Sequence, residues 1–267
     1  MKATLTVLGS GTSMGVPTIG CDCRVCTSAD PHDQRTRPSI LVQYAGHSVL
    51  IDTTPDFRQQ AIREGIRRLD AVLYTHAHAD HILGLDDLRP LSFRRANGKI
   101  PLYAEERTAR WLRSVFRYIF DSDYKYGGLA QVELHHITGP VELFGATFEP
   151  VVVLHGDAEI YGFRFGSAAY LTDFSQIPAA SFAQLRGLEL VFLDALRHKP
   201  HPTHSTVENS LRIVEELKPQ RAFFTHICHD LPHEETNAVL PPHVRLAYDG
   251  LKLEFDIGAP AAAASGQ

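Results

Sequence analysis

The 267-residue sequence lacks long hydrophobic runs, and no stretch approaches the roughly 18 apolar residues of a membrane span. Its first residues, MKATLTVLGSG, lack the basic and then apolar layout of a secretory signal. It also lacks an excess of basic residues, because 26 Lys and Arg stand against 31 Asp and Glu, for a net charge of −5. We therefore expect a cytoplasmic protein that neither enters a membrane nor forms a stable complex with nucleic acid.

Cysteine is scarce as well, because four residues are too few to cross-link a chain of this length. Three of the four crowd into Cys21, Cys23 and Cys26. The two residues of Cys-x-Cys do not easily satisfy disulfide geometry, whereas three thiolates in a tight loop can converge on one tetrahedral Zn²⁺. Histidine, by contrast, is plentiful, with 15 residues, many of them in short clusters. Both patterns indicate metal binding.

The apolar patterning predicts an α+β protein with strands and helices interspersed along one domain, residues 1–257. Residues 20–38 are expected to be a loop insert carrying the cysteines, and residues 258–267 a disordered tail. The last apolar segments predict a closing hairpin over residues 244–255. The other predicted strands cover residues 5–8, 40–44, 49–51, 71–74, 132–137, 147–154, 160–165, 168–172, 189–193 and 221–224, and the predicted helices cover 57–64, 105–120, 178–186 and 205–217.

The predicted helix at residues 105–120 carries large apolar side chains at helical spacing. They are Trp111, Leu112, Val115, Phe116 and Ile119. We interpret all of them as core packing rather than as part of a site. Basic residues that gather in the same region are interpreted as a solvated helix face.

The strongest signal in the chain is His-x-His-x-Asp-His, formed by His76, His78, Asp80 and His81. It follows a predicted buried strand, so that His76 and His78 project to the same side, while the other two follow in a turn that can address a second ion. Neutral imidazole and carboxylate suit Zn²⁺, Mn²⁺ or Fe. The motif therefore predicts a metal site at the end of this strand.

This motif resembles that of the metallo-β-lactamase superfamily of binuclear metallohydrolases. The resemblance implies a four-layer αββα sandwich, and a site completed by a His, a bridging Asp and a final His at later strand ends. The chain offers His155, Asp173 and His226 at such places. The resemblance then implies that His76, His78 and His155 hold one ion, that Asp80, His81 and His226 hold the other, and that Asp173 bridges them.

The sequence is more closely similar to the PhnP-type cyclic phosphodiesterases. The similarity rests on Leu8-Gly9-Ser10-Gly11-Thr12-Ser13, the Gly20–Cys26 loop, Thr225-His226-Ile227-Cys228-His229, and a His 22 residues before His226, namely His204. In that group three cysteines and a His hold a structural Zn²⁺, which implies Cys21, Cys23, Cys26 and His229 here. From the sequence alone, Cys228 is an alternative to His229.

The resemblance implies a metal-dependent phosphodiesterase that cleaves small cyclic phosphodiesters, such as ribose 1,2-cyclic phosphate or 2′,3′-cyclic nucleotides. A hydroxide shared by two Mn²⁺ or Zn²⁺ ions would attack phosphorus. We count Asp80 with the catalytic residues, and we expect His204 to protonate the leaving oxygen, with His201 as its rival. Asp52 is expected to fix the tautomer of a ligand histidine.

Two other functions stay open at this point. One is a thioester, lactone or lactam hydrolase of the same fold, which the same seven ligands would serve. The other is a non-hydrolytic role like that of the biosynthesis protein PqqB, which also carries a Cys-x-Cys-x-x-Cys loop. A small phosphodiester is the expected partner of the chain, and a homodimer is a possibility that rests on the frequency of dimers alone.

Overall fold

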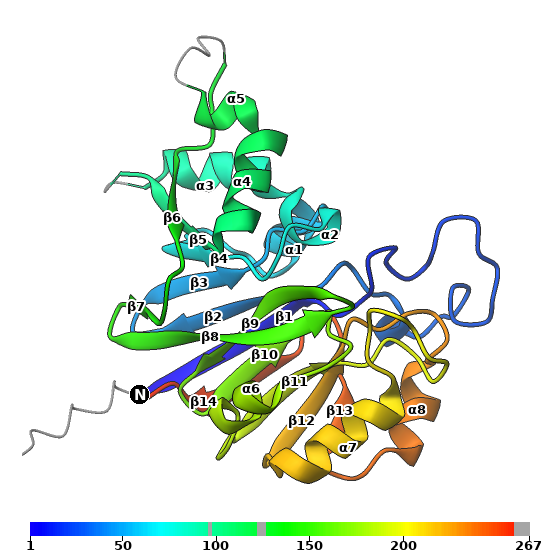
Figure 1. Cartoon of the computed structure of the whole chain (residues 1–267). Coiled ribbons are helices and arrows are strands. Elements are labelled where there is room, and N and C mark those ends of the chain that lie inside the picture. The colour runs from blue at the N-terminus through cyan, green and yellow to red at the C-terminus, as the bar shows by residue number, and fades with distance from the viewer. Residues whose placement is uncertain (96–97, 122–126, 259–267) are drawn as a thin grey trace, which may run out of the picture.

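Two seven-stranded mixed sheets form the centre of the computed structural model, which describes residues 1–95, 98–121 and 127–258 (Figure 1). In the first sheet the strand order is β14-β1-β2-β3-β4-β5-β6, and in the second it is β13-β12-β11-β10-β9-β8-β7. The first sheet comprises β1 (Lys2–Gly9), β2 (Ser39–Tyr44), β3 (His47–Ile51), β4 (Ala71–Leu73), β5 (Ile100–Ala104), β6 (Val132–His136) and β14 (Lys252–Asp256). The second comprises β7 (Val141–Leu143), β8 (Ala146–His155), β9 (Ala158–Phe165), β10 (Ala168–Leu171), β11 (Leu190–Asp194), β12 (Arg221–Thr225) and β13 (Val244–Leu246).

Helices cover the outer face of each sheet, so the molecule has the expected four-layer αββα order (Figure 1). The helices are α1 (Phe57–Arg63), α2 (Ala79–Ile82), α3 (Arg89–Phe93), α4 (Glu106–Val115), α5 (Arg117–Phe120), α6 (Ala179–Gln184), α7 (Val207–Leu217) and α8 (His233–Val239), with short 3₁₀ turns at Pro31–Asp33 and Leu85–Leu88. The first five lie on the side of the first sheet and the last three on the side of the second. The predicted fold class is confirmed.

Three apolar cores correspond to the three interfaces between these layers. The alternation of a strand sends its successive side chains to opposite faces. In β3, Val49 and Ile51 therefore join the core between the sheets, while Leu50 joins the core under the helices of the first half. Phe163 and Phe192 enter the central core from the second sheet. Strands β10 and β11, in the middle of the second sheet, are accordingly buried on both faces.

Parallel pairing within each half brings several strand ends to one edge. The run β3-β4-β5-β6 is parallel, and so is the run β10-β11-β12-β13. Parallel strands deliver the residues after their carboxyl ends to the same rim of a sheet. The His-rich motif follows β4, and Asp173 and His226 follow β10 and β12. The fold thus gathers residues that are far apart in the sequence.

Three expectations about the elements are wrong. The segments expected to form a closing hairpin belong to different sheets, since β13 pairs with β12 and β14 pairs with β1. The helix expected at residues 105–120 is interrupted at Phe116. Trp111 and Val115 are 52% and 42% exposed, so they are not core residues, although Leu112 and Phe116 are buried. Residues 259–267, most of the expected tail, lie outside the described residues.

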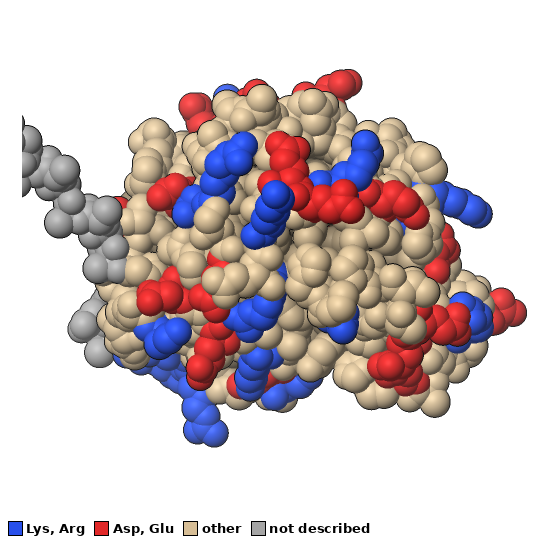
Figure 2. All heavy atoms as spheres, turned by 90° about the horizontal axis from the view of Figure 1, so that it is seen from below, with Lys and Arg blue, Asp and Glu red and all other residues tan. Residues whose placement is uncertain are grey.

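The surface agrees with the low net charge. On the face shown in Figure 2, Lys and Arg side chains are interspersed with Asp and Glu. Among the described residues, no helix has the length and apolarity required to cross a bilayer.

Candidate metal centre

A cluster of four donors forms at the end of β4, where the structure brings together ligand atoms of His76, His78, His155 and Asp173 within 4.8 Å of one another. His76 Nε2 lies 3.0 Å from His78 Nδ1 and 3.8 Å from Asp173 Oδ2. His155 ends β8 and donates its Nδ1 proton to the carbonyl of Thr203, at 2.9 Å. That bond leaves Nε2 of His155 as the free donor atom for a metal.

A second cluster shares Asp173 with the first and adds Asp80, His81 and His226. His81 Nε2 lies 3.2 Å from Asp80 Oδ2 and 3.3 Å from Asp173 Oδ1. His226 Nε2 lies 3.2 Å from Asp173 Oδ2. The two groupings match those inferred from the resemblance, with one carboxylate common to both.

Buried atoms without partners indicate what these clusters would hold. Among the described residues, Asp80 Oδ2, His81 Nε2 and both ring nitrogens of His226 are buried and have no hydrogen-bond partner. A buried polar atom left unpaired costs free energy, and a carboxylate beside imidazole nitrogens is the donor set of a divalent cation. The residues therefore fit two metal ions, one for each cluster.

The electrostatics of the donor residues point the same way. Burial alone would lower the pKa of His81, but the carboxylates of Asp173, Asp80 and Asp52 outweigh it and hold that pKa well above its usual value. Burial also opposes protonation of His226, but Asp173 and Asp80 raise its pKa to about 9. The carboxylates therefore favour positive charge beside them, which a divalent cation would supply when bound.

Asp52 occupies the place expected of a residue that orients a ligand. Its carboxylate is fully buried, and Oδ2 accepts the Nδ1 proton of His81 at 2.8 Å. Thr75 donates its backbone N–H and its hydroxyl to the same carboxylate, both at 2.8 Å. This bonding presents Nε2 of His81 to Asp80 and Asp173.

His204 lies beside the second cluster, with its ring stacked on His226 at 4.6 Å between centroids. Its Nδ1–H donates to Oδ2 of Asp194 at 2.8 Å. Asp194 is fully buried at the end of β11, and burial raises the pKa of this carboxyl while the bond to His204 lowers it. His201 lies farther out, with its ring 4.9 Å from that of His204.

Sequence analysis missed Asp194, although a signal for it exists. Asp194 directly follows four apolar residues of a buried strand, and Asp173 follows a similar run with Thr172 between. The bond to Asp194 fixes the tautomer of His204, so that its other nitrogen, Nε2, is the one able to exchange a proton with a substrate.

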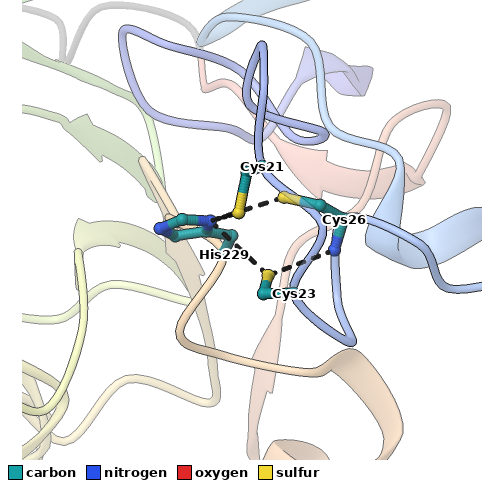
Figure 3. Close-up of side chains that lie close together, drawn as sticks. All are labelled: Cys21, Cys23, Cys26 and His229. Atoms are coloured by element: carbon teal, nitrogen blue, oxygen red, sulfur yellow. Dashed lines mark hydrogen bonds between the residues drawn. The ribbon is translucent and has the colours of Figure 1, made fainter.

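Cys21, Cys23, Cys26 and His229 form a separate cluster at the loop between β1 and β2 (Figure 3). Their sulfurs lie 3.2, 3.6 and 3.4 Å from Nδ1 of His229. Tetrahedral Zn²⁺ with ordinary Zn–S and Zn–N bonds requires about 3.5 Å between such atoms. The four residues therefore fit a structural zinc ion.

Protonation differs between the thiols. The backbone N–H of Cys26 lowers the pKa of Cys23 to about 7, whereas burial raises the pKa of Cys26 to about 11. Cys228, the alternative fourth ligand, stands outside the cluster and accepts the backbone N–H of Asp230 at 3.4 Å. Burial raises its pKa to about 11. The structure thus places His229, and not Cys228, beside the three cysteines.

Arg35 ties this loop to the segment that carries His229. Its guanidinium is fully buried and donates to the carbonyls of Cys228 and Leu231, at 2.9 and 2.7 Å, and to the carboxylate of Asp33 at 3.0 Å. A buried guanidinium with most of its donors paired fixes the geometry of the groups around it. Arg35 therefore connects the loop that carries the cysteines to the segment that carries His229.

Comparison with known proteins places this architecture in a family. Residues 47–227 match the model of the β-lactamase superfamily domain. The solved structure of a diphosphatase from the PhnP family is 65% identical, with a TM-score of 0.91, over 96% of this chain and 99% of that one. Zn²⁺-bound PqqB from Methylobacterium extorquens shares the fold, at 22% identity and a TM-score of 0.76, over 94% and 99% of the two chains.

A curated relative of different name is also similar. An octanoyltransferase from Porphyromonas gingivalis is 41% identical over 255 residues, which are 94% of this chain. The chain spans about half of that relative, 51% of its length. The family match covers most of the chain, and the PhnP-family structure matches it nearly end to end. The chain belongs to the metallo-β-lactamase superfamily and, within it, to the PhnP family of metal-dependent hydrolases.

Proposed function

We propose that the protein hydrolyses P–O bonds of small phosphodiesters, including cyclic ones, or of diphosphates. The observation that carries the proposal is the pair of donor clusters joined by Asp173, beside a histidine that Asp194 orients. When bound, two divalent cations would lower the pKa of a water molecule and place positive charge beside the oxygens on phosphorus. The name of the 65% identical diphosphatase supports chemistry at phosphorus.

The residues of the chain divide this work. Six histidine and aspartate side chains, together with the shared Asp173, would hold the ions, and Asp52 would keep His81 in the correct tautomer. His204 would give the proton of Nε2 to the departing oxygen, and Asp194 would stabilise the ring as its charge changes. Burial lowers the pKa of His155 to about 4, so this residue is neutral at physiological pH and ready to bind a metal.

A second candidate is hydrolysis of a thioester, which the same donor clusters would serve. It draws support from the 41% identity to a relative named for an acyl group, the octanoyltransferase. It lacks a role for the oriented His204, because a thiolate leaves without the help of an acid.

One assay separates the two candidates. Protein loaded with Zn²⁺ or Mn²⁺ is given bis(p-nitrophenyl) phosphate, a 2′,3′-cyclic nucleotide, ribose 1,2-cyclic phosphate, a nucleoside diphosphate and an acyl thioester, with a chelator-treated control. We expect metal-dependent release of phosphate esters or phosphate and no thioester turnover. Thioester turnover alone, or no turnover with both metals demonstrably bound, would contradict the proposal.

A further inference from the structure

A cavity of about 680 Å³ adjoins the candidate metal centre. His76, His78 and His155 line it, and so do residues of α4 and of the β8–β9 turn. The cavity is larger than a phosphate group requires and lies within the range of small-molecule sites. A substrate whose phosphorus is at the metal centre would therefore extend its remaining part into this space.

Trp111 gives this cavity an aromatic surface. It is the only tryptophan of the chain, it lines the cavity, and it is 52% exposed. Its neighbours Ala109 and Leu112 are fully buried, so α4 has a core face that does not use the indole. A large aromatic left half-exposed in a cavity offers a flat surface on which a planar ring can stack.

The charges of the cavity lining exclude one class of occupant. The lining includes three carboxylates, those of Glu105, Asp157 and Glu159, and one guanidinium, that of Arg107. An excess of carboxylates repels a second phosphate group but accepts hydrogen bonds from hydroxyls and amines. The remote part of the substrate is therefore uncharged or cationic and rich in donors.

The capping bonds of Glu105 leave one of its carboxylate oxygens for a ligand. Glu105 caps the N-terminus of α4. Its Oε2 accepts the backbone N–H groups of Arg107 and Thr108. Its Oε1 is not used in these bonds. Glu159 and Tyr161 line the same cavity as Glu105.

We propose that this cavity is a nucleoside subsite, in which Trp111 stacks on the base and Glu105 and Glu159 accept hydrogen bonds from the ribose hydroxyls. The inference rests on the proposed function and narrows it. It names a nucleoside phosphate, rather than a sugar that carries an additional phosphate, as the substrate class. Trp111 is in this account a specificity-determining residue.

The single tryptophan allows a direct test of binding. Excitation at the red edge of indole absorption, where the nine tyrosines do not absorb, makes the fluorescence of the Zn²⁺-loaded protein report Trp111 alone. The protein is titrated with adenosine 5′-monophosphate, and with ribose 5-phosphate as the same ligand without its base. We expect saturable quenching by the nucleotide and little change with the sugar phosphate. Equal quenching by both, or none by the nucleotide, would overturn the inference. So would emission that depends on protein concentration without ligand, because a second copy would then cover Trp111.

Kinetics give an independent measurement. Trp111→Leu is expected to raise KM for a 2′,3′-cyclic adenosine phosphate by about 10-fold or more with little change in kcat, because stacking on a remote base acts equally on ground and transition states. Trp111→Phe should restore most of the affinity. Val115→Ala, at another exposed position of α4 outside the cavity lining, is the matched control and should leave KM unchanged.

The two proposals can fail separately. Quenching by the nucleotide without hydrolysis of any phosphate ester would support the subsite and contradict the proposed function. Hydrolysis of phosphodiesters with an unchanged KM in Trp111→Leu would contradict the subsite and leave the proposed function standing.

Discussion

Asp52, Asp173 and His226 share an unusual backbone conformation, with φ of 67°, 56° and 58°. Residues other than glycine reach this left-handed region at a cost of about 1 kcal/mol or more each. All three lie within two residues of a strand end, and their side chains belong to the metal centre or contact it. These backbone conformations lower the stability of the fold, and they occur where carboxylate and imidazole groups are brought together.

Removal of the His204 imidazole tests its role as a proton donor. We expect His204→Ala to lower kcat by about 100-fold or more on a cyclic nucleotide, whose alkoxide leaving group requires a proton. The loss should be small on a p-nitrophenyl diester, whose leaving group departs unprotonated. The exposed His198→Ala serves as the control.

Metal content must be measured on the same samples, because ligand atoms of Asp194, His204 and His226 also lie within 4.8 Å of one another. Loss of metal from His204→Ala, or an equal loss of activity on both substrates, would show that His204 is not the proton donor.

His233 makes stability depend on pH. Burial, together with the neighbouring His32 and Arg35, lowers its pKa to about 4. Between its unfolded pKa of about 6.5 and 4, the unfolded chain binds a proton that the folded protein does not, so acidification through this window destabilises the fold. We expect His233→Gln to reduce this loss by about 2 kcal/mol. Chemical denaturation at several pH values measures it, and the exposed His243→Gln should keep the wild-type dependence.

At the scale of elements, the long β1–β2 loop is organised by its polar contacts more than by a core of its own. Its apolar cluster contains only Val16, Val25 and Cys26 as buried members. The buried Arg35 and the four-residue Cys/His cluster connect it to the segment after β12, which also carries His226. Metal binding at the loop therefore supports the position of an active-site donor three residues away from His229.

Cysteine substitution separates the two kinds of metal site. We expect Cys23→Ser to lower bound zinc by about one ion per chain while the two ions of the His/Asp clusters stay, and to lower the melting temperature, because structural zinc contributes folding free energy. Cys228→Ser, in the same segment but outside the cluster, should keep all the zinc. Zinc loss from the Cys228 variant alone would reverse the assignment of the fourth ligand.

Sequence patterns were sufficient where the information is local. The His-rich motif, the cysteine spacing and most strands follow from neighbouring residues, and the structure gathers the predicted donors into two groups. Pairing of β14 could not be read in this way, because its partner β1 lies at the other end of the chain. β13 pairs in parallel with the preceding strand β12 instead of with β14, and short apolar segments do not show which neighbour they join. The exposure of Trp111 could not be predicted either. Helical spacing shows which residues share a face of a helix, but not how much of that face the rest of the protein covers.

At the scale of the whole molecule, the metal centre joins the two halves. His76, His78, Asp80 and His81 follow a strand of the first sheet, while His155, Asp173 and His226 follow strands of the second. Each predicted ion would therefore have ligands from both sheets. Binding that requires both halves stabilises their packing as well as the site itself.

Removal of metal should consequently destabilise the entire fold. At metal concentrations about 1,000 times Kd, one ion adds about 4 kcal/mol, so we expect chelation to lower the melting temperature by about 10 °C or more. Readdition of Zn²⁺ should restore it. A melting temperature that does not respond to chelator, with metal loss verified, would show that the site contributes nothing to the packing of the sheets.

The pairing of β14 with β1 brings Met1 beside the end of the last strand. The Met1 ammonium lies 2.8 Å from Asp256, and Ile257 donates its N–H to the Met1 carbonyl at 2.9 Å. Circular permutation should therefore be tolerated: residue 257 joined to residue 1 by a short linker, with new ends at the exposed Arg186–Gly187 turn, is expected to bind the same number of metal ions. The metal centre would then form from the packed strands even when the chain connects them in a different order.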